Sequence, residues 1–196
     1  MIIDRLGQVW AADNNNLYTL DTLLNLKFKY TDKTLGHVNG LYPDETDGLW
    51  LATENGLMFF DTREKKLKDY TKLPNSLKNK LKDVHFIFQG SGNDTWIGTQ
   101  SSLLRYTSNT KKLDEVRLKS VSPQSIYSCM VRDQASILWI GTNNGLIKYD
   151  LKTPKFQLYN SDNLALTSQD IASVFKDDQN RLWIGTWGEG LNIFLA

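Results

Sequence analysis

The sequence predicts an all-β chain, a β-propeller of about five four-stranded blades whose first and last blades are incomplete. One short phrase recurs five times, led by tryptophans 40 to 46 residues apart: Trp10, Trp50, Trp96, Trp139 and Trp183. The residue two positions after each of these tryptophans is always small, either alanine or glycine. A self-similar period of roughly 40 to 50 residues rich in short strands is typical of propeller blades, which bury their faces on their neighbours.

Each repeat unit resolves into four short strands separated by turn-forming residues. In the fourth unit the strands are expected at residues 127–132, the inner strand, then 138–142, 146–150 and 156–159, the outer strand. Side chains alternate between the two faces of a strand, so the small residue lies on the same face as the indole. This pairing indicates tight packing of blade on blade. The blades of this single propeller segment are expected at residues 1–31, 37–71, 83–118, 126–159 and 170–196.

Three further positions of the repeat have structural interpretations. The third strand carries an apolar residue and, two positions on, an aromatic one, as in Ile147 and Tyr149, and both are expected to pack. Asp21, Asp61 and Asp150 follow that strand, where an aspartate favours a turn because its side chain can bond the neighbouring backbone. The residue six positions before the tryptophan belongs to another repeated turn: Asp4, Asp44, Gly90, Asp133 and Asp177.

Each end of the chain lacks part of a blade. The first unit enters midway through its inner strand, at residues 1–4, and the last unit ends after its third strand. Unpaired strand edges of this kind are usually covered in natural proteins. We therefore expect the chain to be a fragment of a larger ring, one with about six to eight blades.

The composition agrees with a globular β protein and excludes several partners. The formal net charge is +1, from 23 Lys and Arg against 22 Asp and Glu, so no basic face indicates nucleic acid or anionic lipid. Cys129 is the single cysteine, expected to be a buried structural thiol. No segment approaches the roughly 20 apolar residues of a membrane span, and no signal peptide is visible. Either the chain is cytoplasmic or its targeting signal lies elsewhere.

Two phrases of the chain carry a family resemblance. LWIGTNNGLIKYD, starting at Leu138, and RLWIGTWGEGLNIF, starting at Arg181, each follow an inner strand and an aspartate-bearing turn. They resemble the two-component regulator propeller repeat, most closely in the last two units and least in the first. The resemblance implies the periplasmic sensor region of a membrane-anchored bacterial hybrid two-component histidine kinase. It also implies partners: an oligosaccharide ligand, neighbouring propeller or sandwich domains, and a second protomer of a homodimer.

No pattern of catalytic or metal-binding residues stands out, and no cofactor is expected. The two histidines, His37 and His85, and one cysteine are too few for a clustered metal site. The glycine-rich phrase leads from one strand into another and not into a helix, so it does not indicate a phosphate-binding loop. Glu54 with Glu189 is a conceivable carboxylate pair for a glycosidase, but we favour a chain without enzymatic activity.

Binding is the better-supported role, and propeller topology indicates where it occurs. The loops from outer strand to next inner strand and from second to third strand emerge on one face. Amides, carboxylates and imidazoles suit the hydroxyls of a sugar, and an indole can stack on a pyranose. Ordinary loop polarity and, for His85, a structural role are the alternatives. The candidate ligand-binding residues on this face are Trp187, His85, Asn39, Gln100, Asn143, Glu54 and Glu189.

Two functions of different classes follow. The first is a non-enzymatic sensor segment that binds a carbohydrate-derived ligand and passes the event to a histidine kinase outside these residues. Ligand occupancy would then bias packing between propellers or protomers. The second is a protein-interaction scaffold, since repeats supply broad surfaces irrespective of chemistry. A polar concavity on the loop face favours the first function, and an exposed apolar patch there favours the second.

Overall fold

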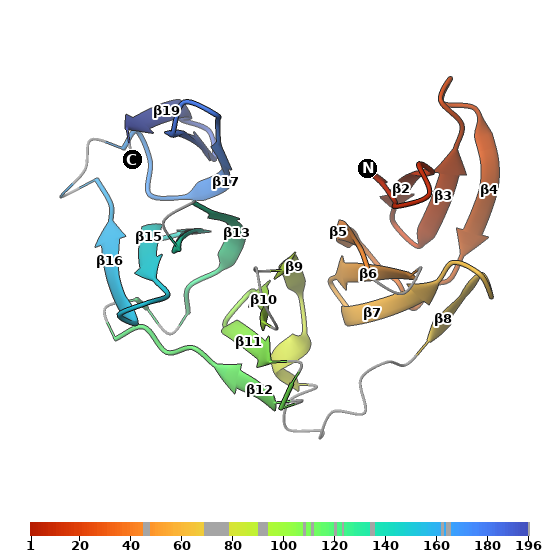
Figure 1. Ribbon diagram of the computed structural model, residues 1–196, viewed down its shortest axis with the longest axis horizontal. Coiled ribbons are helices and arrows are strands. Elements are labelled where there is room, and N and C mark those ends of the chain that lie inside the picture. The colour runs from red at the N-terminus through yellow and green to blue at the C-terminus, as the bar shows by residue number, and fades with distance from the viewer. Residues whose placement is uncertain are drawn as a thin grey trace. The chain divides into compact units, whose positions relative to one another are not determined.

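The computed structural model is an all-β protein built of five small sheets (Figure 1). It describes residues 1–44, 48–68, 79–89, 94–107, 109–110, 112–119, 121–122, 124–133, 136–161, 163 and 166–195. The helical structure within these residues is one 3-10 turn, η1 (Asn79–Leu81). No helix in this described part is long and apolar enough to cross a membrane.

Strands that follow one another in sequence are also neighbours in each sheet. Blade 1 contains β1 (Ile2–Ile3), β2 (Val9–Asp13), β3 (Asn16–Leu20) and β4 (Leu26–Thr31). Blade 2 contains β5 (Val38–Pro43), β6 (Gly48–Thr53), β7 (Gly56–Asp61) and β8 (Lys66–Lys68). Blade 3 contains β9 (Val84–Gln89), β10 (Asp94–Thr99), β11 (Leu103–Thr107) and β12 (Lys112–Glu115). Blade 4 contains β13 (Tyr127–Arg132), β14 (Ile137–Thr142), β15 (Gly145–Asp150) and β16 (Lys155–Tyr159), and blade 5 contains β17 (Ile171–Lys176), β18 (Arg181–Thr186) and β19 (Gly190–Leu195).

This arrangement confirms the predicted propeller fold. In blade 4 the observed strands begin at the predicted residue or one residue earlier, and they pair antiparallel in the order of the chain. The first inner strand is only two residues long, and in the described residues blade 5 has three strands, as predicted for the terminal blades. Gly90 and the predicted end of blade 2 at residue 71 lie outside the described residues.

The chain divides into two compact units, and each is described by itself. Unit 1 (Met1–Ile87) contains blades 1 and 2 and the start of β9. Unit 2 (Phe88–Ala196) contains the rest of blade 3 and blades 4 and 5.

The core of unit 1 lies between blades 1 and 2. Trp10 projects from one face of blade 1, and we call this side of any blade its tryptophan face. It packs on the other side of blade 2, which we call the opposite face and which includes Leu49 and Leu51, the residues flanking Trp50. The rings of Trp10 and Phe60 meet edge to face, with centroids 5.8 Å apart. The buried cluster consists of Trp10, Leu17, Leu35, Leu41, Leu49, Leu51 and Phe60.

Unit 2 contains the same contact twice. Trp96 of blade 3 meets Tyr149 of blade 4 edge to face at 5.7 Å, and Trp139 of blade 4 meets Phe194 of blade 5 at 5.8 Å. Phe60, Tyr149 and Phe194 all lie on third strands, so the predicted packing role of these aromatics is confirmed. Each receives the indole of the preceding blade, a geometry that stabilises by about 0.5–1.5 kcal/mol beyond simple burial.

The small residue after the tryptophan is needed where two blades meet. A Cβ added to Gly141 would lie 2.5 Å from Cys129 Sγ and 2.8 Å from Ile171 Cγ2 of blade 5. Gly185 has the same register in blade 5, where the close contact of an added Cβ would be with Ser173 Oγ, also at 2.5 Å. Ser173 is exposed, so its hydroxyl can rotate away, whereas the atoms around Gly141 are held between two blades.

We expect Gly141→Ala to lower the free energy of unfolding by about 1–3 kcal/mol, because the added methyl overpacks the contact between blades 4 and 5. The matched variant Gly185→Ala should lower it by less than about 0.5 kcal/mol. Urea unfolding followed by tryptophan fluorescence measures both. Equal losses in the two variants would contradict the tight packing assigned to Gly141.

The aspartate six residues before the tryptophan anchors the indole. The indole N–H donates to this carboxylate over 2.8 to 2.9 Å in three blades: Trp10 to Asp4, Trp50 to Asp44 and Trp183 to Asp177. The Trp183 N–H, assisted by Arg181, holds the pKa of Asp177 well below its usual range. In blade 4 the pattern differs, since Trp139 Nε1 is buried without a hydrogen-bond partner in the described part of the chain.

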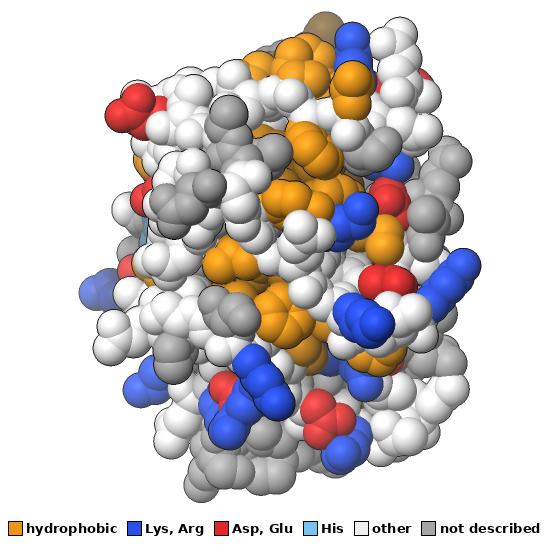
Figure 2. All heavy atoms as spheres, turned by 90° about the vertical axis from the view of Figure 1, so that its left-hand side faces the viewer, with side chains coloured by type: hydrophobic (Ala, Val, Ile, Leu, Met, Phe, Trp, Pro, Cys, Tyr) orange, Lys and Arg blue, Asp and Glu red, His pale blue; other side chains and the backbone are white. Residues whose placement is uncertain are grey.

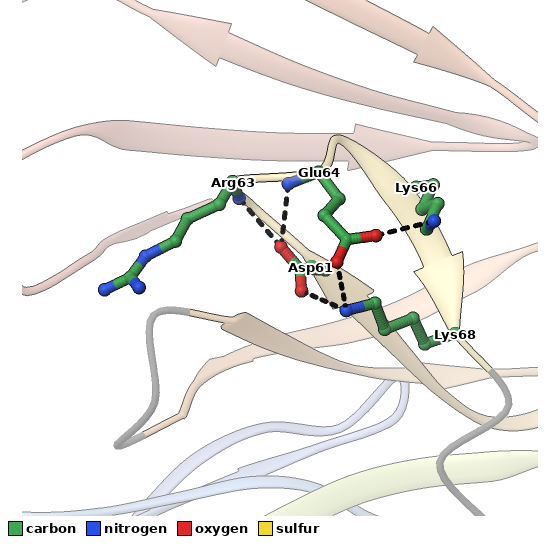
Figure 3. Close-up of polar contacts among 5 residues, drawn as sticks. All are labelled: Asp61, Arg63, Glu64, Lys66 and Lys68. Carbon is green, nitrogen blue, oxygen red and sulfur yellow. Dashed lines mark hydrogen bonds and ion pairs between the residues drawn. The ribbon is translucent and has the colours of Figure 1, made fainter.

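The aspartates after the third strand form the predicted turns, as Figure 3 shows for Asp61 between β7 and β8. Asp61 Oδ1 accepts the backbone N–H of Arg63 at 2.9 Å and that of Glu64 at 2.8 Å. Lys68 Nζ lies 2.6 Å from Asp61 Oδ2 and 2.9 Å from Glu64 Oε1. The Glu64 N–H and Lys68 lower the pKa of Asp61 to about 2, and the two carboxylates raise the pKa of Lys68 to about 12.

We expect this turn to make the protein sensitive to acid. The folded pKa of Asp61 lies below its ordinary value of 3.8, so its contribution to stability is present above that pH and is lost as the pH falls toward about 2. Asp61→Asn keeps an oxygen acceptor without the charge and should lose less stability between about pH 4 and pH 2. The urea midpoint of both proteins, measured against pH, tests this. Parallel curves would contradict the role of the carboxylate.

Candidate functional site

The loop face of unit 1 contains an open polar hollow of about 480 Å³. Three loops surround it: the β2–β3 loop, the β4–β5 loop and the β6–β7 loop. These are the two loop families predicted to share one face. Small-ligand sites commonly measure about 300–1,000 Å³ but are mostly apolar, whereas every side chain here is polar. The lining residues are Asn14, Asn15, Lys33, Gly36, His37, Glu54 and Asn55.

The local sequence explains why these loops turn sharply. Asn15 and Gly36 have φ angles of 65° and 61°, in the left-handed region that asparagine tolerates and glycine adopts at no steric cost. Gly56, at φ 126°, is more demanding, because a Cβ there would lie 2.8 Å from the backbone oxygen of Leu81. The Asn-Gly pair at 55 and 56 is therefore fixed by the close approach of η1.

Hydrogen bonds tie the loops of the two blades together. Asn15 N donates to Gly36 O at 2.9 Å, and Gly36 N donates back to Asn15 Oδ1 at 3.1 Å. Glu54 N donates to His37 O at 3.0 Å, which joins the β6–β7 loop to the start of β5. The loops around the hollow thus form one connected rim.

The backbone contact at Glu54 recurs in unit 2. The residue four positions after the tryptophan donates its N–H to the residue thirteen before it, from Asn143 to Ile126 at 3.2 Å and from Trp187 to Asp170 at 2.9 Å. Because the backbone makes this bond, the repeat does not require one side chain at the position. That is why glutamate, asparagine and tryptophan can all occupy it.

His37 is oriented toward one protonation pattern by Asn14. Its Nδ1 lies 2.6 Å from Asn14 Oδ1. An amide oxygen only accepts, so Nδ1 carries the hydrogen and a neutral ring leaves Nε2 as an acceptor. Lys33 adds a cationic donor, Glu54 an anionic acceptor, and Asn55 an amide with both kinds of group. The hollow can therefore both donate to and accept from the hydroxyls of a ligand.

The predicted site residues of unit 1 fall into two groups. Glu54 lines the hollow with an exposed side chain. Asn39 and His85 lie on the inner strands β5 and β9 and are not among the lining residues. Asn39 Nδ2 donates to Val84 O at 2.8 Å, linking these two strands, and His85 Nε2 lies 3.6 Å from Asp83 Oδ1. Both contacts fit the structural alternative for these residues.

The predicted site residues of unit 2 lie in loops, as expected. Gln100 is exposed directly after β10. Asn143 is half-buried, and its Oδ1 accepts the backbone N–H of Ile126 at 2.9 Å. Trp187 and Glu189 share the β18–β19 loop, where the indole is 68% exposed and so fills no core. Trp187 and Glu189 are thus brought onto one loop of unit 2, whereas Asn39, Glu54 and His85 belong to unit 1.

Three lining residues, Asn15, Lys33 and Asn55, were missed by the sequence reasoning. That reasoning selected the position four after the tryptophan, whereas Asn15 and Asn55 stand five after it. Their signal was turn chemistry, since asparagine in a short hairpin loop favours a positive φ. Lys33 lies in the link between blades, where the repeat register offers no marker.

The chemistry of the hollow suits binding better than hydrolysis. Glu54 is the single carboxylate among its described lining residues, whereas glycoside hydrolysis commonly uses two. No group of three His, Cys, Asp or Glu in the described part of the chain could hold a metal ion. The only other crevice considered has a volume of about 10 Å³, room for about one water, and is lined by Asp4, Arg5, Leu6, Pro43, Asp44, Gly48 and Thr62.

Known structures share this fold. The extracellular domain of a putative one component system from B. thetaiotaomicron is 21% identical, with a TM-score of 0.77, over 95% of this chain and 25% of that one. The extracellular domain of a putative hybrid two component system from the same organism is 22% identical, with a TM-score of 0.71, over the same shares. The chain therefore spans about a quarter of the length of each.

Virginiamycin B lyase from Staphylococcus aureus also matches, at 17% identity and a TM-score of 0.68, over 100% of this chain and 68% of that one. At these identities the likenesses show the fold alone. Nothing matches the chain among curated proteins. Residues 120–144 and 165–188, which contain Trp139 and Trp183, match the two component regulator propeller model. The resemblance seen in the sequence is confirmed, and the chain carries repeats of the two component regulator propeller family.

Proposed function

We propose that this chain is the ligand-sensing propeller segment of a periplasmic two-component sensor and that it binds a carbohydrate-derived ligand without chemical change. The observation that carries the proposal is the polar hollow on the loop face of blades 1 and 2. The similarity to the extracellular domain of a putative hybrid two component system supports a sensor outside the cytoplasm.

The ligand class follows from the groups that line the hollow. Asn14, Asn55 and His37 offer neutral donors and acceptors, while Glu54 and Lys33 offer charged ones. A polyhydroxylated molecule can satisfy such a set, since each hydroxyl both donates and accepts. An apolar ligand would leave these groups desolvated and unpaired, at a cost of about 1–3 kcal/mol each.

The site also has a route to a conformational signal. The rim joins the β2–β3 loop of blade 1 to the β4–β5 link and the β6–β7 loop of blade 2. A ligand that bridges these loops favours the blade spacing that it fits best, because a ligand shifts an equilibrium through its differential affinity for two states. In the proposed sensor this bias reaches a histidine kinase outside these 196 residues.

A protein-interaction scaffold is the second candidate function. The observation in its favour is the exposed indole of Trp187 in the β18–β19 loop, since tryptophan is enriched among interface anchors. The polar lining of the unit 1 hollow favours the sensor.

The test is calorimetric titration of the 196-residue chain with heparin-, pectin-, mannan- and glucan-derived oligosaccharides. We expect one class to bind and to raise the melting temperature. Glu54→Gln should weaken that binding about five- to tenfold, because a charge-assisted hydrogen bond is lost. The matched variant Glu64→Gln changes the same type of residue in the β7–β8 turn and should leave affinity unchanged.

Two results would overturn the proposal in different ways. If no oligosaccharide class binds, carbohydrate sensing by this segment is wrong. If Trp187→Ala weakens binding while Glu54→Gln does not, the ligand lies on the loop of unit 2 and the hollow is not its site. Melting curves of each variant without ligand separate a lost contact from a lost fold.

A further inference from the structure

The tryptophan face of blade 5 is apolar and exposed. The register Phe175↔Trp183↔Ile193 places three apolar side chains in one row across the sheet. Leu191 and Leu195 flank Ile193 on the same face, because side chains two positions apart share a face. Ile193 is 54% exposed, and Phe175, Leu191 and Leu195 are more exposed still. Figure 2 shows hydrophobic side chains at the surface at the top of the molecule, where β19 lies in Figure 1.

Three contacts inside the two units show what such a face binds. In each, the tryptophan face of one blade packs on the opposite face of the next blade, with the indole against a third-strand aromatic. In unit 2 this contact buries Leu182 and Ile184 of blade 5 completely beneath the tryptophan face of blade 4. The exposed side of blade 5 is the surface that, by the same rule, packs on the opposite face of another blade.

Blade 1 exposes that complementary surface. Its opposite face carries Ile3, Val9 and Leu20 in one row, with Leu26 paired to Leu20. Val9 holds the register of Leu182, directly before the tryptophan, which blade 5 buries completely. Ile3 is 67% exposed and Val9 is only half-buried. Blade 1 thus has apolar residues at positions that the repeat normally covers.

We propose that these two faces bind each other between copies of this chain, head to tail. The tryptophan face of blade 5 in one copy takes the opposite face of blade 1 in the next. The two surfaces are different and complementary, so the contact is heterologous and each copy leaves one face of each kind for further copies. A net charge of +1 per chain opposes such association only weakly.

The test is light scattering of the 196-residue chain over a range of concentrations. We expect the mean mass to rise above 22.4 kDa as concentration increases. Ile193→Lys should return the mass to that of the monomer, because it places a charge in the centre of the proposed contact. Leu23→Lys is the matched control, since Leu23 is equally apolar and exposed but lies in the β3–β4 turn, and this variant should associate like wild type.

Cross-linking shows which faces meet. Two single-cysteine proteins are prepared with Cys129→Ser, one carrying Ile3→Cys and the other Ile193→Cys. Mixed and oxidised, they should form a disulfide-linked heterodimer faster than either protein links to itself. A wild-type chain that stays monomeric at every concentration overturns the proposal, including when a chain with both cysteines links only within itself. Equal loss of association in Ile193→Lys and Leu23→Lys overturns it as well.

Discussion

Trp139→Ala is expected to lower the free energy of unfolding by about 3–5 kcal/mol, the cost of removing a large buried aromatic side chain. Trp139 is 0% exposed and sits in the contact between blades 4 and 5. Its ring meets Phe194 edge to face at 5.8 Å and lies 5.9 Å from the ring of Tyr159. The substitution would leave a cavity walled by two blades, which cannot collapse without moving a whole sheet.

Two further variants separate burial from other roles of the indole. Trp139→Phe should cost less than the alanine variant, because it keeps a ring against Phe194 and removes the buried Nε1 that has no partner in the described residues. Trp187→Ala, which removes an exposed indole, should change stability by less than about 0.5 kcal/mol. Urea unfolding measures all three. An unchanged midpoint in Trp139→Ala would show that this indole does not hold the blades together.

The fold could be predicted because the repeat states its structure five times. A buried tryptophan, a small residue on the same strand face and an apolar-aromatic pair on the third strand mark every blade. Asp61 shows the same for turns, since its predicted backbone bonding is what the structure contains. These features depend on neighbours close in sequence, which a single chain reveals.

Contacts between repeats were harder to predict. The sequence marks Trp10 and Phe60 as packing residues but does not say that they pack on each other, because this depends on which face of one blade covers the next. The anchoring of the indole by the preceding aspartate was also missed, although Asp4 and Trp10 stand six residues apart in a repeated register. The direction of a side chain at a strand end is set by the turn, which the pattern does not specify.

The candidate site was predicted in outline and not in detail. Topology located the correct loop face, and Glu54 was correctly placed on it. Asn39 was expected to face a ligand, but its amide nitrogen bonds the backbone of Val84. Polarity alone cannot distinguish a side chain that meets solvent from one that joins two strands, since both require a hydrogen-bonding group.

Phe60→Ala is the counterpart of Trp139→Ala in unit 1, and we expect it also to cost about 3–5 kcal/mol. Phe60 is 0% exposed and meets the rings of both Trp10, at 5.8 Å, and Tyr30, at 4.9 Å. Phe60→Leu should cost less, because it keeps most of the buried volume while losing the two ring contacts.

The double variant of Phe60 and Trp139 tests how far the two cores are independent. The clusters around these residues share no member, one lying wholly in unit 1 and the other wholly in unit 2. Substitutions without shared partners usually add to within about 0.3–0.5 kcal/mol. We therefore expect the losses of Phe60→Ala and Trp139→Ala to sum in the double variant, measured by urea unfolding in a background that remains folded at low denaturant. A double variant that loses much less than the sum would mean that the first substitution already disrupts the other core, and that the repeats unfold as one structure.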